Sequence, residues 1–296
     1  MEKTVSRNEV SARLESRVVQ YFDAGHSRHG NVRADVAAWL IVAFWGSRVL
    51  RPQLEAIGRQ LQERQLPDGR VPINPEFPEA AWPTPLAMLA WQRQGNAPSA
   101  LAGAQEFLLR WHGLHYPSRG TRTIGHDTSL RGWPWVDGTH SWIEPTVLSL
   151  LALGACGRTA DDRCVQARRM ILNRQLSGGG WNFGNTTVYG LELRPMPHST
   201  GMALTALSRA GEAFALSNSV RYLDQSIRRI RTPLSLGWGI IGLTASDELV
   251  EEAPVWIDEC LEREAEVGGY DMVLLCLLQC ALHAKQGHPL LSGPAA

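Results

Sequence analysis

The feature that most constrains the fold of this 296-residue chain is a repeated unit, in which a polar helix, a glycine-rich turn with tryptophan and a small apolar helix follow one another. The clearest copy spans residues 161–207. Its polar helix ends near Gln175, its turn is Ser177-Gly178-Gly179-Gly180-Trp181, and Pro197-His198-Ser199-Thr200 opens the apolar helix. Units of this size that bury their apolar faces against one another are typical of helical-pair arrays.

Two kinds of helix alternate along the chain. The polar kind has apolar residues three and four positions apart, as in Val220, Leu223 and Ile227, which predicts one buried face. The second kind is apolar nearly all round and is therefore expected to be buried on every side. The polar helices are predicted at about 8–22, 53–65, 99–112, 161–175, 216–231 and 247–265. The apolar helices are predicted at about 34–46, 83–94, 144–155, 198–210, 236–245 and 269–284.

The apolar helices can be placed in register. Thr84, Thr146 and Thr200 occupy the same position in three of them, and Asp35 and Asp271 take that position in the first and last copies. An open array would need polar caps at its ends, but the first and last helices are as apolar as the others. We therefore predict an all-α fold, in which six outer and six inner helices close into one α/α toroid domain over residues 1–296. An open superhelix and an ordinary helical bundle are the alternatives.

The turn between the paired helices has its own sequence signature. Gln175-Leu176-Ser177-Gly178-Gly179-Gly180-Trp181 combines a glutamine, which is expected to cap a helix end and stack on the tryptophan, with glycines that tolerate positive φ. Residues 65–71 look like a second copy with Val71 in place of the tryptophan. Residues 132–146, with Gly132-Trp133, look like a diverged third copy, and Leu236-Gly237-Trp238-Gly239 looks like a fourth.

These turns resemble the QW motif of the prenyltransferase and squalene-oxidase repeat family. That family includes class II terpene cyclases and the β subunits of protein prenyltransferases. The resemblance covers roughly residues 30–285. It implies an α/α toroid with an apolar cavity of isoprenoid size.

The catalytic signatures of the family match less well. Class II cyclases protonate an alkene through Asp-x-Asp-Asp, which this chain does not contain; Asp161-Asp162 is the nearest pair and is expected to cap a polar helix. Prenyltransferases hold zinc through Asp-x-Cys and a distant histidine. Asp258-Glu259-Cys260 has that look, but the only later histidines, His283 and His288, follow too soon. No metal site and no cofactor is therefore expected.

If the inner helices run parallel, their N-termini meet at one mouth, where their dipoles add to a positive field. A cluster of three carboxylates and an imidazole there could supply a general acid, because apolar walls and mutual repulsion raise a carboxyl pKa. The alternative is that each group is only a helix cap or a structural hydrogen-bonding residue. The candidate catalytic residues are Asp35, Glu144, His198 and Asp271.

Aromatic faces stabilise a carbocation without attacking it. Several tryptophans lie on the inner helices or beside their starts, where they could line a cavity; simple packing is the alternative. The candidate substrate-binding residues are Trp39, Trp82, Trp142, Thr200 and Trp238.

Two other groups could hold a metal. Cys276, Cys280 and His283 share one helical face, although a buried apolar helix with incidental cysteines explains them better. His112, His115 and the pair His126-Asp127 form a second group, which is expected to lie in a solvated loop.

Composition limits the partners. Lys+Arg and Asp+Glu are 29 each, so the zero net charge gives no general attraction to nucleic acid. Five scattered cysteines, no bilayer-spanning apolar stretch and no signal peptide favour the cytoplasm. An apolar small molecule is the expected ligand, and a peripheral membrane contact and a partner subunit remain open.

These features predict first a terpene-cyclase-like enzyme that protonates an isoprenoid in a central cavity, with a non-standard acid. A non-catalytic isoprenoid- or lipid-binding protein is the second interpretation. A prenyltransferase β-like subunit and an α/α-barrel glycosidase are further alternatives.

Overall fold

The computed structural model describes residues 5–25, 32–117, 124–208, 213–285, 288 and 290. These residues form an all-α structure with one short hairpin, β1 (Thr187–Val188) and β2 (Leu191–Glu192). The helices that correspond to the predicted inner set are α2 (Ala34–Phe44), α4 (Thr84–Gln94), α6 (Ile143–Ala155), α8 (Pro197–Leu207), α10 (Pro233–Ala245) and α13 (Met272–Leu282). The polar helices are α1 (Arg7–Asp23), α3 (Arg51–Glu63), α5 (Pro98–Arg110), α7 (Asp162–Asn173), α9 (Ala213–Ile227), α11 (Ala253–Glu262) and α12 (Glu264–Val267).

Burial separates the two kinds of helix as their sequences predict. In α1 the buried residues are Val10, Leu14, Val18 and Phe22, a single stripe with a spacing of four. In α2 ten of the eleven residues are buried, so that helix has no solvent face. The predicted inner segment 198–210 is helical to Leu207, and residues 209–210 lie outside the described residues.

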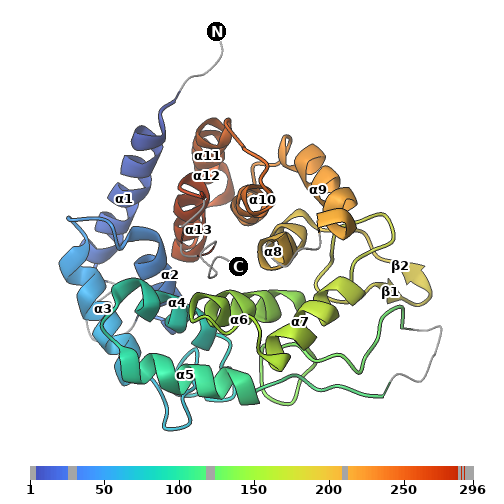
Figure 1. Ribbon diagram of the computed structural model, residues 1–296. Helices are drawn as coiled ribbons and strands as arrows, with labels where there is room; N and C mark the ends of the chain where they lie inside the picture. The colour runs from blue at the N-terminus through green and yellow to red at the C-terminus, as the bar shows by residue number, and fades with distance from the viewer. Residues whose placement is uncertain are drawn as a thin grey trace.

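The apolar helices pack side by side in chain order. Helix α2 contacts α4, and the succession continues through α6, α8 and α10 to α13, which contacts α2. Figure 1 shows these helices grouped around a common centre, with the charged helices outside them. Helices α3, α5, α7, α9 and α11 each contact one or two apolar helices close to them in the chain, as α9 does with α8 and α10, whereas α1 packs on α13.

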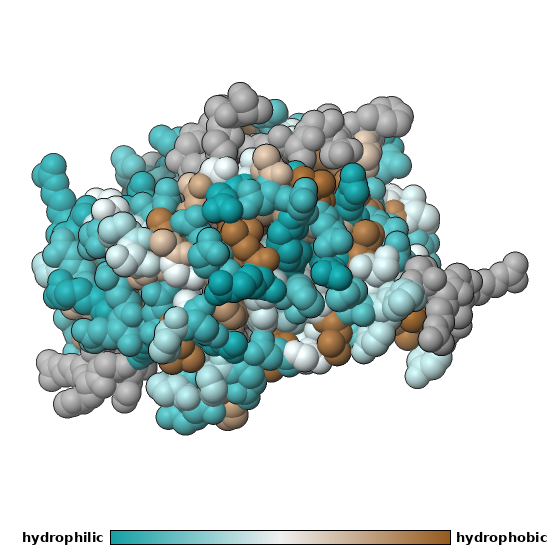
Figure 2. All heavy atoms as spheres, turned by 60° about the horizontal axis from the view of Figure 1, so that its bottom comes forward, coloured by the Kyte–Doolittle hydropathy of each residue, from teal (hydrophilic) through white to brown (hydrophobic). Residues whose placement is uncertain are grey.

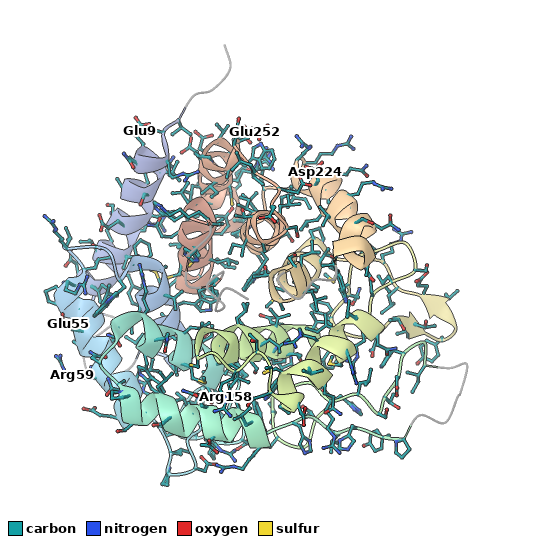
Figure 3. The ribbon with its side chains drawn as sticks, viewed as in Figure 1. Glu9, Glu55, Arg59, Arg158, Asp224 and Glu252 are labelled. Carbon is teal, nitrogen blue, oxygen red and sulfur yellow. The ribbon has the colours of Figure 1, made fainter. Side chains whose placement is uncertain are left out.

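The first and last parts of the outer layer are joined by ion pairs. Arg13 of α1 binds Asp258 of α11, and Arg17 of α1 binds Glu264 of α12, with 2.8 Å between its Nη2 and Oε1. Elsewhere the outer surface is charged: Glu9, Glu55, Arg59 and Asp224 lie on the outside of their helices in Figure 3. Figure 2 shows hydrophilic side chains over most of one face, with apolar ones in small separate groups.

The threonines in register anchor three of the inner helices, α4, α6 and α8, to the turns before them. The Thr84 hydroxyl accepts a hydrogen bond from the backbone N–H of Val71 at 2.9 Å. Thr146 accepts from Trp133 at 2.9 Å, and Thr200 accepts from Trp181 at 3.0 Å. Because these residues occupy equivalent places in the proposed turns, the three copies are structural repeats as well as sequence repeats.

The glycine-rich turns also share their backbone geometry. Gly69 and Gly179 have φ values of 95° and 94°, and each donates its N–H to a leucine carbonyl three residues earlier at 2.9 Å. The repeat glutamines hydrogen-bond to the backbone of the following outer helix. The Gln65 amide donates to Ala100 of α5 and the Gln175 amide to Ala215 of α9, so each ties its turn to the next outer helix.

Of the two predictions that cover residues 236–239, the apolar helix is confirmed and the fourth turn is wrong. Residues 236–239 lie inside α10, which begins at Pro233, three residues earlier than predicted. Glycines of α8 and α10 allow close packing of these two helices. A Cβ on Gly201 of α8 would lie 2.1 Å from the carbonyl oxygen of Trp238, and one on Gly242 would lie 2.5 Å from the Cα of Gly201. Helices α8 and α10 can therefore approach each other backbone to backbone.

Candidate functional site

Asp35 lies in the first turn of α2 and is bound by the residue before that helix. Its side chain is only 5% exposed. Arg33 reaches it with two hydrogen bonds, from Nε to Oδ1 at 3.0 Å and from Nη2 to Oδ2 at 2.8 Å. This bidentate geometry compensates the buried carboxylate with a fixed positive charge.

Asp271, the second predicted acid, is the N-cap of α13. Its side chain is exposed and accepts a hydrogen bond from the Val273 backbone N–H at 2.9 Å. The hydrogen bond to Asp35 and the nearby charge of Asp271 both raise the pKa of Arg33. A cavity of about 470 Å³ opens here, and Arg17, Tyr21, Arg33 and Asp271 contribute to its lining.

Glu144, the third predicted acid, has a different environment. It lies in the first turn of α6, where the N-cap is Trp142, and its side chain is partly buried. Within the part of the chain that the structure describes, it forms no hydrogen bond and no ion pair. Burial without a charged partner raises the pKa of Glu144 to about 7. The carboxyl group is therefore poised to hold and release a proton near neutral pH.

His198 lies in the first turn of α8 and is 5% exposed. Its ring packs on Phe183, with 5.4 Å between centroids. The Phe183 carbonyl accepts a hydrogen bond from the Ile143 N–H at 2.9 Å, so Phe183 lies between the starts of α6 and α8. The structural hydrogen bond considered for His198 is absent among the described residues. Burial lowers its pKa, which favours the neutral imidazole.

The candidate aromatic residues fall into three environments. Trp39 of α2 and Trp238 of α10 pack edge to face with centroids 6.0 Å apart, and both are buried. Trp82 packs in the same way on Trp135, at 5.2 Å. Trp142 lines a cavity of about 290 Å³ at the start of α6.

Thr200 has a structural partner. Its side chain is fully buried, and its hydroxyl holds the Trp181 backbone N–H. This hydrogen bond, which two other repeats share, explains the buried threonine at this position without a ligand.

The structure brings the predicted acids and base together as two groups. Asp35 and Asp271 share the surroundings of Arg33, and Glu144 and His198 lie at two helix starts that Phe183 connects. Sequence reasoning missed Arg33 and Phe183. Arg33 could have been found as a cation two residues before a buried aspartate, whereas Phe183 is placed only by the tertiary fold.

The predicted histidine group lies in loops, and His112 is exposed as expected, but His115 and His126 are half-buried. His115 and His126 each have a buried Nδ1 atom without a hydrogen-bond partner. Among the described residues no group of three or more His, Cys, Asp or Glu side chains could hold a metal ion. Cys276 and Cys280 are buried in α13, as an apolar helix predicts. Asp258 of the zinc-like triplet is committed to Arg13.

No protein-family model matches the chain, and the curated proteins contain no match. In the segments described by the structure, no helix is both long and apolar enough to cross a bilayer.

Proposed function

We propose that the inner helices close into an α/α toroid of the kind found in the prenyltransferase and squalene-oxidase repeat family. The return of the contact succession from α13 to α2 supports closure. The ion pairs of α1 with α11 and α12 support closure of the outer layer as well. The shared turns at Gly69 and Gly179 support the repeat relationship.

We further propose that the protein is a terpene-cyclase-like enzyme in which Glu144 is the acid. The observation that carries this proposal is the partly buried, unpaired Glu144 carboxyl, whose pKa burial raises to about 7. Asp35 and Asp271 are less suited, because an arginine holds the first and a backbone N–H holds the second.

In this mechanism the protonated Glu144 donates its proton to a carbon–carbon double bond of a polyprenyl substrate. A new C–H bond forms from the alkene electron pair, a carbocation remains on the substrate, and Glu144 becomes a carboxylate. Ring closure consumes further double bonds, and loss of a proton ends the reaction. His198, which is buried at the start of the neighbouring helix α8 and whose pKa burial lowers, is the group that would accept this final proton.

Substitution of the acid tests the proposal. Glu144→Gln keeps the size of the side chain but removes the transferable proton, so cyclised product should fall by about 100-fold or more. Asp271→Asn is the matched control, since an amide oxygen can still cap α13. Product is measured by gas chromatography after incubation with polyprenyl substrates. Turnover that is equal in Glu144→Gln and the wild type would remove Glu144 as the acid.

A binding protein without catalysis is the second candidate. The pairing of Asp35 with Arg33 and the capping role of Asp271 favour it, because they leave one unpaired carboxyl where three were predicted. Extraction of the purified protein distinguishes the two functions. A bound, unmodified isoprenoid or lipid supports carriage, whereas a cyclised product supports catalysis.

A further inference from the structure

A second cavity, of about 290 Å³, lies between the hairpin, the end of α7 and the loop that precedes α6. In Figure 1 the hairpin lies on the outer side of α7, away from the common centre of the apolar helices. Besides the hairpin and Arg174, three chain segments surround the cavity: residues 114–116, 124–128 and 139–142. Backbone hydrogen bonds join Leu114 to Thr139 at 2.8 Å and Tyr116 to Thr128 at 2.9 Å, so the frame does not depend on a ligand.

Arg174 lines this cavity with a positive charge that the described protein does not neutralise. Its side chain is 7% exposed and donates from Nη1 to the Ser141 carbonyl at 2.7 Å. Its Nε atom is buried and has no partner, and no carboxylate in the described residues pairs with it. A buried cation without a counter-ion is costly, so a bound anion would stabilise it.

Arg163 of α7 also has a buried Nε without a partner and no carboxylate partner among the described residues, but the rest of its guanidinium is satisfied within the protein. Its guanidinium donates to the carbonyl groups of Arg131, Trp111 and Gly132 and lies 3.6 Å from the centroid of the Trp133 ring. Arg174 has one such carbonyl partner and faces an open cavity instead.

The rest of the lining suits an oxyanion. His126 has a buried Nδ1 without a partner and lies close enough to Arg174 for the guanidinium to contribute to the lowering of its pKa, which burial mainly causes. Tyr116, Asn185 and Thr187 add neutral hydrogen-bonding groups, and the lining contains no Asp or Glu. The Asp127 side chain is held by the N–H and hydroxyl of Ser129, at 2.8 and 2.7 Å.

Apolar side chains share this cavity. Leu114, Ile124 and Val188 line it and are 43%, 45% and 39% exposed, and Trp142 also contributes to the lining. Such exposed apolar groups around a charged pocket fit a ligand that has an apolar part beside its anionic part.

We propose that this cavity binds a phosphate group that carries an apolar substituent, with Arg174 and His126 as its principal partners. A tetrahedral phosphate has more acceptor oxygens than a carboxylate and so matches this number of donors better. The site is independent of proton donation by Glu144, and its test uses binding alone.

Calorimetric titration of the purified full chain with inorganic phosphate tests the anionic part. Arg174→Gln should weaken binding by about 10-fold or more, as expected for the loss of hydrogen bonds from a charged donor. Arg169→Gln removes one charge from the exposed surface of the same helix and should leave the affinity unchanged. His126→Gln should weaken binding several-fold and carries the test if Arg174→Gln does not fold. No phosphate binding by the wild type, or equal binding by wild type, Arg174→Gln and His126→Gln, would overturn the proposal.

The apolar part and the source of the phosphate are tested with two further probes. Octyl phosphate should bind about 10-fold more tightly than inorganic phosphate, because the alkyl chain buries apolar surface. Equal affinity of the two would contradict the apolar part. Vesicles of phosphatidylcholine with and without phosphatidic acid then identify the source. Arg174-dependent binding only to the phosphatidic acid vesicles indicates a lipid headgroup, and binding of the small phosphates alone indicates a free ligand.

Discussion

Two regions at the starts of the apolar helices hold carboxyl groups in opposite ways. Around α2 and α13, Asp35 is bound by Arg33 and Asp271 by a backbone N–H. Around α6 and α8, Glu144 has no partner among the described residues and His198 packs on a phenylalanine ring. The first region compensates negative charge with hydrogen-bond donors. In the second region, burial favours the neutral forms of Glu144 and His198.

This difference matters because a compensated carboxylate is a structural group, whereas an uncompensated one can exchange a proton near pH 7. Ion pairing favours the charged state of an acid, and burial favours its neutral state. An acid in the first turn of an inner helix therefore has different chemistry in α2 and α6. Its place at a helix start alone does not identify the proton donor.

The largest expected effect is the pH dependence of stability caused by Glu144. Burial raises the pKa of Glu144 from 4.5 to about 7. Between pH 4.5 and about pH 7, the folded protein therefore keeps a proton that the unfolded chain has released. The free energy of unfolding should fall by about 2–3 kcal/mol as the pH rises through this window. Denaturant titrations of the wild type and Glu144→Gln measure it. The variant should lack this loss, and parallel pH profiles would contradict the raised pKa.

Removal of Arg33 tests the other region. Arg33→Met leaves Asp35 buried without its cation, so the free energy of unfolding should fall by about 1–3 kcal/mol. Arg33→Met combined with Asp35→Asn should recover much of the loss, because no uncompensated charge remains. Denaturant unfolding of the single and double variants gives the coupling energy, and additive effects would show that the pair is not a unit.

Loss of the α13 cap should have a smaller effect. Asp271→Ala removes the acceptor for the Val273 N–H and should cost about 1 kcal/mol of unfolding free energy. Asp271→Asn should retain most of the stability because its amide oxygen can accept the same bond. If both variants lost stability equally, the charge rather than the hydrogen bond would be important.

His198 should give the smallest effect, opposite in sign to that of Glu144. Burial lowers its pKa, so the unfolded chain binds the proton more readily than the folded protein. Its contribution to stability should therefore be lost as the pH falls below its ordinary value of 6.5 and through the folded pKa. An NMR titration of the imidazole follows this directly, with His198→Phe to assign the signal. An unshifted or raised pKa would contradict the buried neutral ring.

Helix positions were predictable from the sequence because a helix that buries one face needs apolar residues at a regular spacing. The single stripe of α1 and the unbroken apolar run of α2 each allow one interpretation. The threonine register is matched by the equivalent hydrogen bonds of Thr84, Thr146 and Thr200. The turn at residues 236–239 failed because a local Gly-Trp-Gly pattern is compatible with both a turn and a tightly packed helix. The close approach of α8 to α10 decided between them.

The sequence could predict which residues belong to the candidate site, but not which of them have an ionic or hydrogen-bonding partner. Asp35 and Glu144 look equivalent in the sequence, since each is an acid at the start of an apolar helix. What separates them is the presence or absence of a partner, and that depends on where Arg33 reaches in three dimensions. The lack of a carboxylate partner for Arg174 was not predictable for the same reason, because a missing counter-ion has no sequence pattern.

The pairing of α1 with α11 and α12 has a consequence for biosynthesis. Arg13 and Asp258 are 245 positions apart, so the first helix to be made has to wait for almost the whole chain before its ionic partners exist. Until then its stripe from Val10 to Phe22 lacks its cover from α13. A nascent chain that is stalled before α11 would present this stripe to chaperones, and joining of the two ends of the helical layer would be the last step of folding.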